Sequence, residues 1–82
     1  MYHKPDISAL GGKILFHRRR LGLTQAMLAA KLCVSYQAIS AWENSTTLPD
    51  ITNLCRLSEL FGVAVDELLK SDTDAPTLLL GV

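Results

Sequence analysis

The chain has 82 residues, 49% of them hydrophobic, and a formal net charge of zero. This length allows one domain with a modest core, and no apolar run approaches the roughly 18–20 residues that span a bilayer. The sequence therefore predicts neither a membrane span nor a signal peptide, and we expect a cytoplasmic protein.

Charge is unevenly distributed along the chain. Residues 13–47 hold five basic side chains and one acidic one, a net charge of +4, whereas residues 48–82 hold two basic and six acidic ones, a net charge of −4. Because salt screens charges beyond about 10 Å, the basic end of such a molecule can bind a polyanion. The alternative is that both halves are ordinary solvated faces, and charge asymmetry alone does not exclude it.

The cysteines and histidines do not form a metal-binding pattern. Cys33 and Cys55 lie far apart in the sequence and match no ligand spacing, and His3 and His17 have no partner at a useful spacing. We expect two reduced, buried cysteines that pack as small hydrophobic residues. No metal and no cofactor are predicted.

The first predicted helix covers about residues 7–21, with Asp6 as its N-cap and Gly22 at its C-terminal end. The glycine pair at positions 11 and 12 is unfavourable inside a helix, so it marks an alternative start. Helical spacing predicts a buried face made of Ile7, Leu10, Ile14, Leu21 and the stem of Arg18.

Two short helices are predicted next, over about residues 25–32 and 36–44. Thr24 and Ser35 are their candidate N-caps, since each hydroxyl can accept a hydrogen bond from the first turn. Their inner faces are predicted to comprise Leu28, Ala29, Leu32, Ile39 and Trp42. Two short helices joined by a three- or four-residue turn are typical of a helix-turn-helix, whose second helix lies in the DNA major groove.

A fourth helix is predicted to begin after its candidate N-cap Asp50 and to end at Gly62, and a short fifth helix covers about residues 66–70. Their buried residues are expected to be Ile51, Leu54, Cys55, Leu57, Ser58, Phe61, Val63, Val65, Leu68 and Leu69. The predicted fold is therefore all-α, a compact five-helix bundle in residues 1–70. Residues 71–82 are polar and then apolar, and we expect this tail to pack on a second subunit; docking on its own bundle is the alternative.

From about residue 10 to residue 70 the chain resembles the lambda-repressor-like (Cro/cI-type, XRE-type) helix-turn-helix DNA-binding domains. The matching residues are Ile14, Arg18, Leu23, Thr24, Gln25, Leu28, Ala29, Val34, Ser35, Ile39, Ser40, Trp42, Glu43, Leu48, Pro49, Asp50, Leu54, Leu57, Phe61, Gly62, Val63, Asp66, Glu67, Leu68 and Leu69. The resemblance implies a five-helix bundle that binds operator DNA as a symmetric dimer.

Four residues on the outward face of the helix over 36–44 are predicted to contact bases. Gln37 can pair with adenine N6 and N7, and Tyr36 can meet a thymine methyl or reach a phosphate. Ser40 reads bases with little discrimination, and Ala41 offers only apolar contact to a thymine methyl. The alternative is an ordinary exposed helix face.

Phosphate contacts are predicted at the two helix starts and after the second helix. Gln25 lies where backbone amides carry partial positive charge, and the resemblance implies that it contacts the DNA backbone and braces the recognition helix; an ordinary exposed helix start is the alternative. In residues 44–47, hydroxyl, amide and backbone N–H groups are expected to donate. The predicted phosphate-contact residues are Thr24, Gln25, Ser35, Asn44, Ser45, Thr46, Thr47, Arg19, Arg20 and Lys31, with Lys13 also available.

The resemblance also implies a structural ion pair between Arg18 and Glu43, and it identifies three departures from the family pattern. Cys33 and Ser45 stand where relatives commonly have glycine, so we expect mild strain if these positions are left-handed. Ala41 stands where many relatives have a basic residue, so one phosphate or guanine contact is missing.

The functional prediction is a sequence-specific transcriptional regulator, a repressor that binds double-stranded DNA as a homodimer. The alternative is an antitoxin or antirepressor that uses the same fold to hold a protein partner, with Leu78, Leu79 and Leu80 as the docking element. An enzyme is not predicted, because the sequence shows no nucleophile–base pair, carboxylate pair or phosphate loop, and so small a chain cannot form a deep pocket. For the same reason no small-molecule ligand is expected.

Overall fold

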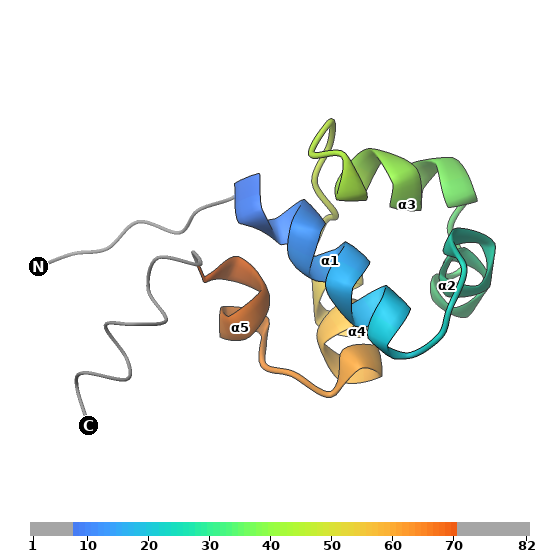
Figure 1. Cartoon of the computed structure of the whole chain (residues 1–82). Coiled ribbons are helices and arrows are strands. Elements are labelled where there is room, and N and C mark those ends of the chain that lie inside the picture. Colours follow the sequence, from blue (N-terminus) through green and yellow to red (C-terminus); the bar gives the residue numbers. More distant parts are fainter. Residues whose placement is uncertain (1–7, 71–82) are drawn as a thin grey trace, which may run out of the picture.

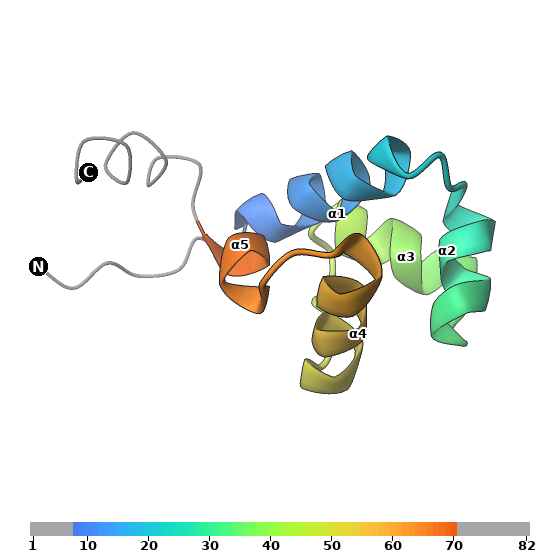
Figure 2. The same cartoon turned by 90° about the horizontal axis from the view of Figure 1, so that it is seen from below.

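The structure, a computed structural model, describes residues 8–70. These residues form five helices and no strand: α1 (Ser8–Arg20), α2 (Gln25–Leu32), α3 (Tyr36–Glu43), α4 (Ile51–Phe61) and α5 (Val65–Leu69). Helix α1 runs along the bundle and contacts α3, α4 and α5, while α2 packs on α3 and α4 (Figures 1 and 2). The predicted all-α fold with five helices is confirmed. Within residues 8–70, no helix is long and apolar enough to cross a membrane.

The starts of α2, α3 and α4 are set by local side chains, as predicted. The Thr24 and Ser35 hydroxyls accept from the backbone N–H of the third residue that follows, at 3.0 and 3.2 Å, and the Asp50 carboxylate does the same at 2.8 Å. Gly22 and Gly62 both have a φ of +72°, which ends α1 and α4 at little steric cost. The boundaries of α1, α3 and α5 differ from prediction by one residue, and Asp6 and Ile7 lie outside the described residues.

The core gathers apolar residues from all five helices. It comprises Leu10, Ile14, Leu28, Ala29, Leu32, Ile39, Trp42, Leu54, Leu57, Phe61 and Leu68. The structure contradicts four predictions of burial: Leu21, Ile51, Cys33 and Cys55 are exposed. Leu21 follows the last residue of α1, where the chain turns away. Ile51 and Cys55 lie four residues apart and share the outer face of α4, opposite its buried residues.

Gly11 lies inside α1, so the alternative helix start at the glycine pair is wrong. A Cβ atom at this position would lie 2.6 Å from the Trp42 carbonyl oxygen and 2.7 Å from that of Glu43. The absence of a side chain therefore lets the backbone of α1 rest directly on the C-terminal end of α3. At the neighbouring Gly12 a Cβ atom would meet nothing within 4 Å. Only the first glycine has a packing role, and that role holds α3 in place.

Candidate nucleic-acid interface

Helices α2 and α3 form a compact unit joined by a tight turn (Figure 1). Cys33 ends α2 in the left-handed conformation, with a φ of +58°, and its N–H donates to the Ala30 carbonyl at 3.3 Å. The next N–H, that of Val34, donates to the Ala29 carbonyl at 3.0 Å. These two bonds close the end of α2 and fix where α3 begins. The left-handed geometry expected at Cys33 is therefore present, on a residue with a Cβ atom.

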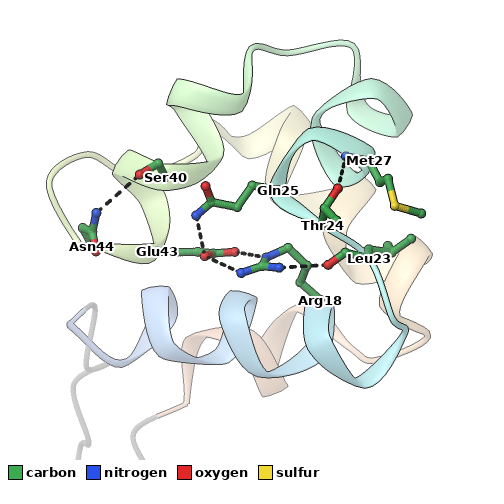
Figure 3. Close-up of polar contacts among 8 residues, drawn as sticks. All are labelled: Arg18, Leu23, Thr24, Gln25, Met27, Ser40, Glu43 and Asn44. Atoms are coloured by element: carbon green, nitrogen blue, oxygen red, sulfur yellow. Dashed lines mark hydrogen bonds and ion pairs between the residues drawn. The ribbon is translucent and has the colours of Figure 1, made fainter.

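The predicted ion pair between Arg18 and Glu43 is present, and it joins three elements (Figure 3). Arg18 donates to both Glu43 carboxylate oxygens, through Nε at 2.6 Å and Nη2 at 3.1 Å, and through Nη1 to the Leu23 carbonyl at 2.8 Å. The Gln25 side chain donates from Nε2 to Glu43 Oε1 at 3.0 Å. One carboxylate thus ties α1, the start of α2 and the end of α3 together.

The ion pair between Arg18 and Glu43 is buried, and its two charges cancel. The side chains of Arg18 and Glu43 are only 10% and 4% exposed. The hydrogen bond to Glu43 raises the pKa of Arg18, against the opposing effect of burial, so the guanidinium stays charged. Because the negative charge of Glu43 is buried against a positive one, it does not repel a polyanion lying over α3.

The four predicted base-contact residues lie on one face of α3. Tyr36 and Gln37 are exposed, and Ser40 and Ala41 are half-buried. The face is fixed by Ile39 and Trp42, which are buried on the opposite side of the same helix. Asn44, predicted as a phosphate contact, adjoins this face, because its Nδ2 donates to Ser40 Oγ at 3.4 Å (Figure 3). The Ser40 hydroxyl proton remains available to donate.

The starts of α2 and α3 present donors to solvent. In capping their helices, the Thr24 and Ser35 hydroxyls act as acceptors, which leaves each O–H proton free to donate to another acceptor. The first amides of each helix carry partial positive charge and have no partner within the helix. Gln25 is half-buried at the first of these turns. Two hydroxyls and two helix starts are thus grouped around α3, a donor set suited to phosphate oxygens.

The segment after α3 differs from the prediction. The backbone N–H groups of residues 44–47 all donate to carbonyls of α3: Asn44 to Ser40, Ser45 to Trp42, and Thr46 and Thr47 to Ala41. They are therefore unavailable to a phosphate, and only the exposed side chains can act there. Ser45 has a φ of +62°, the left-handed geometry expected from the family's glycine.

The basic residues divide into engaged and available side chains. Lys13 donates to the carbonyls of Glu67 and Lys70 at the end of α5, and Arg20 donates to the Phe61 carbonyl at 2.7 Å. Both stabilise the carbonyl ends of helices, a role the sequence analysis missed. Lys31 is exposed in the last turn of α2.

Arg19 is exposed on α1. It lines a shallow pocket on the outer side of α1, together with Gly12, Leu15, Phe16 and Arg20. Helix α1 meets α3 through Gly11 and Arg18, which do not line this pocket. Cations are generally favoured near helix C-termini, and this tendency could have indicated the roles of Lys13 and Arg20. The helix ends that they contact lie more than 40 residues away in the sequence, so the pairing could not be predicted.

Comparison with known proteins identifies this arrangement. A family model described as helix-turn-helix matches residues 17–68. The repressor protein C2 of Salmonella phage P22 is 41% identical over 63 residues, which are 77% of this chain and 29% of that protein. The HTH-type transcriptional activator BcrR of Enterococcus faecalis is 44% identical over 50 residues, 61% of this chain and 24% of BcrR.

A solved structure extends the comparison to three dimensions. The P22 c2 repressor in complex with a synthetic operator superposes with a TM-score of 0.72 and 41% identity, covering 77% of this chain and 96% of that one. The chain spans less than a third of the length of the two curated relatives described above.

Proposed function

This chain belongs to the lambda-repressor-like (XRE-type) helix-turn-helix family, and on that premise we propose that it is a sequence-specific DNA-binding transcriptional regulator. In the proposed complex α3 lies in the major groove of double-stranded DNA. Two copies related by a two-fold axis bind two half-sites, and occupancy of a promoter represses transcription. The named relatives include both a repressor and an activator, so the sign of regulation is part of the proposal.

One observation supports this function above others: the outward face of α3 is mostly polar, reaches solvent and is held in a fixed rotation. The rotation is fixed because Ile39 and Trp42 are buried and because Glu43 is held by Arg18 and Gln25. A helix pre-positioned in this way loses little conformational entropy when it binds. Direct base readout needs such a fixed helix, because a bidentate contact tolerates little displacement.

The proposed roles follow from the exposed donors and acceptors. Tyr36, Gln37, Ser40 and Ala41 face the base edges, with Gln37 as the residue that discriminates most. The proposed phosphate contacts are made by the side chains of Thr24, Gln25, Lys31, Ser35, Asn44, Thr46 and Thr47. Arg20 is left out because its bonds to Phe61 and His17 hold it against α4 and α1, and Arg19 is left out because it lines the α1 pocket with Arg20. Ser45 is also left out of the proposed phosphate contacts, because its left-handed backbone forms the turn after α3.

The test is selection of bound sequences from random duplex DNA, followed by affinity measurements on the selected site. We expect a palindromic sequence with half-sites about one helical turn apart. Gln37→Ala should weaken binding to the selected site by about 1–3 kcal/mol, roughly 5- to 150-fold, because a bidentate base contact is lost. A second selection with the variant should show relaxed preference at one position in each half-site.

The matched control is Thr52→Ala, which removes an exposed polar side chain from α4 and should leave affinity unchanged. Equal loss in both variants would contradict readout by α3. If a folded protein shifts no DNA at low salt but co-purifies with another protein, the antitoxin or antirepressor function replaces the one proposed.

A further inference from the structure

The outer side of α1 carries an exposed apolar feature that the proposed function does not use. A shallow pocket of about 570 Å³ is lined by Gly12, Leu15, Phe16, Arg19 and Arg20. Phe16 is 62% exposed, although its ring also meets the edge of the buried His17 at a centroid distance of 5.0 Å. Gly12 leaves the pocket open. An aromatic ring beside two arginines is suited to an apolar segment that also carries acidic residues.

A segment of this kind follows Lys70 in the sequence, and Lys70 lies against α1. The Lys70 carbonyl accepts a hydrogen bond from Lys13 Nζ, and Lys13 directly follows the pocket residue Gly12 in α1. Figure 2 shows α5 beside the first turns of α1, and the two helices are in contact. Phe16 is three residues beyond Lys13, about 4.5 Å along the helix axis. The twelve residues 71–82 can extend up to about 40 Å, so they reach the pocket easily.

The composition of that segment matches the pocket. It places Asp72 and Asp74 before Leu78, Leu79 and Leu80. Among residues 8–70 the Arg19 side chain has no ion-pair partner, and Arg20 uses Nε and Nη2 internally, which leaves Nη1 to donate. We propose that residues 71–82 dock intramolecularly on α1, with the three leucines against Phe16 and Leu15 and the two aspartates beside Arg19 and Arg20. The segment then covers the largest exposed aromatic side chain of α1.

The experiment compares amide chemical shifts of the full chain with those of the triple variant Leu78→Ser, Leu79→Ser, Leu80→Ser. We expect shift changes at Gly12, Leu15, Phe16 and Arg19 and none at residues 36–41. In the reciprocal variant, Phe16→Ser, the leucine methyl shifts should move toward random-coil values. The double variant Asp72→Asn, Asp74→Asn should shift the same α1 amides in the same direction by a smaller amount, because it removes the two negative charges proposed to lie beside Arg19 and Arg20.

The matched control is Ile51→Ser, which removes a still more exposed apolar side chain from α4 and should leave the leucine methyl shifts unchanged. Trp42 fluorescence reports that each variant remains folded. Unchanged α1 shifts in the triple variant would overturn the proposal, and so would shift differences that grow with protein concentration, because these indicate a second copy as the occupant. No DNA is present in this experiment, so its outcome is independent of the proposed function.

Discussion

At residue 11 the absence of a side chain determines how closely α1 approaches α3. We predict that Gly11→Ala destabilises the fold by about 1–3 kcal/mol, because its Cβ atom would lie within 2.7 Å of two carbonyl oxygens of the α3 backbone. Urea unfolding monitored by Trp42 fluorescence measures the change. Because the displaced atoms belong to the end of α3, DNA affinity should fall as well.

The neighbouring glycine provides the control. Gly12→Ala introduces the same methyl group where no atom lies within 4 Å, and alanine is the better helix former. We therefore expect unchanged stability or a gain of up to about 1 kcal/mol. Equal losses from the two substitutions would show that close packing at residue 11 is not the cause.

A second prediction at this scale concerns pH and His17. The imidazole is buried, its ring stacks on Phe61 at 5.2 Å, and its Nδ1 accepts from Arg20 Nε at 3.1 Å. Burial lowers the pKa of His17 below its ordinary 6.5; Arg20 and Lys13 lower it further, and Glu67 opposes the shift. Since the unfolded chain binds the proton more readily, this contribution to stability is complete above pH 6.5 and is lost as pH falls through the lower folded pKa.

Urea unfolding between pH 8 and pH 5 tests this prediction against His17→Phe, which keeps an aromatic ring against Phe61 and cannot titrate. The free energy of unfolding of the original chain should fall relative to that of the variant once the pH drops below 6.5. Parallel pH profiles for the two proteins would contradict the role assigned to His17.

Among the elements, the turn after α2 and the turn after α3 each contain a residue with a Cβ atom in left-handed geometry. We predict that Cys33→Gly stabilises the fold by up to about 1 kcal/mol, because glycine adopts a φ of +58° without steric strain. The same substitution at Cys55, inside α4, should destabilise it by about 1 kcal/mol. Thermal unfolding of the two variants measures the gain and the loss of stability. A loss of stability from Cys33→Gly would contradict strain in the turn.

The elements also show how far sequence reasoning reaches. The starts of α2, α3 and α4 were predicted well because Thr24, Ser35 and Asp50 act on residues only three positions away. The outward face of α3 was predicted because the buried Ile39 and Trp42 determine it. Lys13 and Arg20 were counted as available to phosphate because their partners in the fold, the ends of α5 and α4, come close only in the folded chain. The backbone N–H groups after α3 were misassigned for a related reason: the closing turn uses them internally.

For the whole molecule, the number of free basic side chains limits how strongly salt affects DNA binding. The sequence offers five basic residues in its basic half, but Arg18, Lys13 and Arg20 are engaged inside the fold. Among the phosphate contacts proposed, Lys31 is the cation, and the others are neutral donors that displace no condensed counterion. The dependence of DNA affinity on salt concentration should therefore be set by the phosphate contact of Lys31 and by the number of protein copies bound.

We predict that Lys31→Ala makes the slope of log Kobs against log salt concentration shallower by about 0.9 for each copy on the DNA, hence by about 2 for a dimer. The measurement is a titration of the selected palindrome at several salt concentrations. Lys70→Ala removes the same charge at the end of α5, far along the chain from α2 and α3, and should leave the slope unchanged. A change of about 1 would indicate a single bound copy, whereas no change would remove Lys31 from the interface and leave phosphate binding to neutral side chains and helix amides.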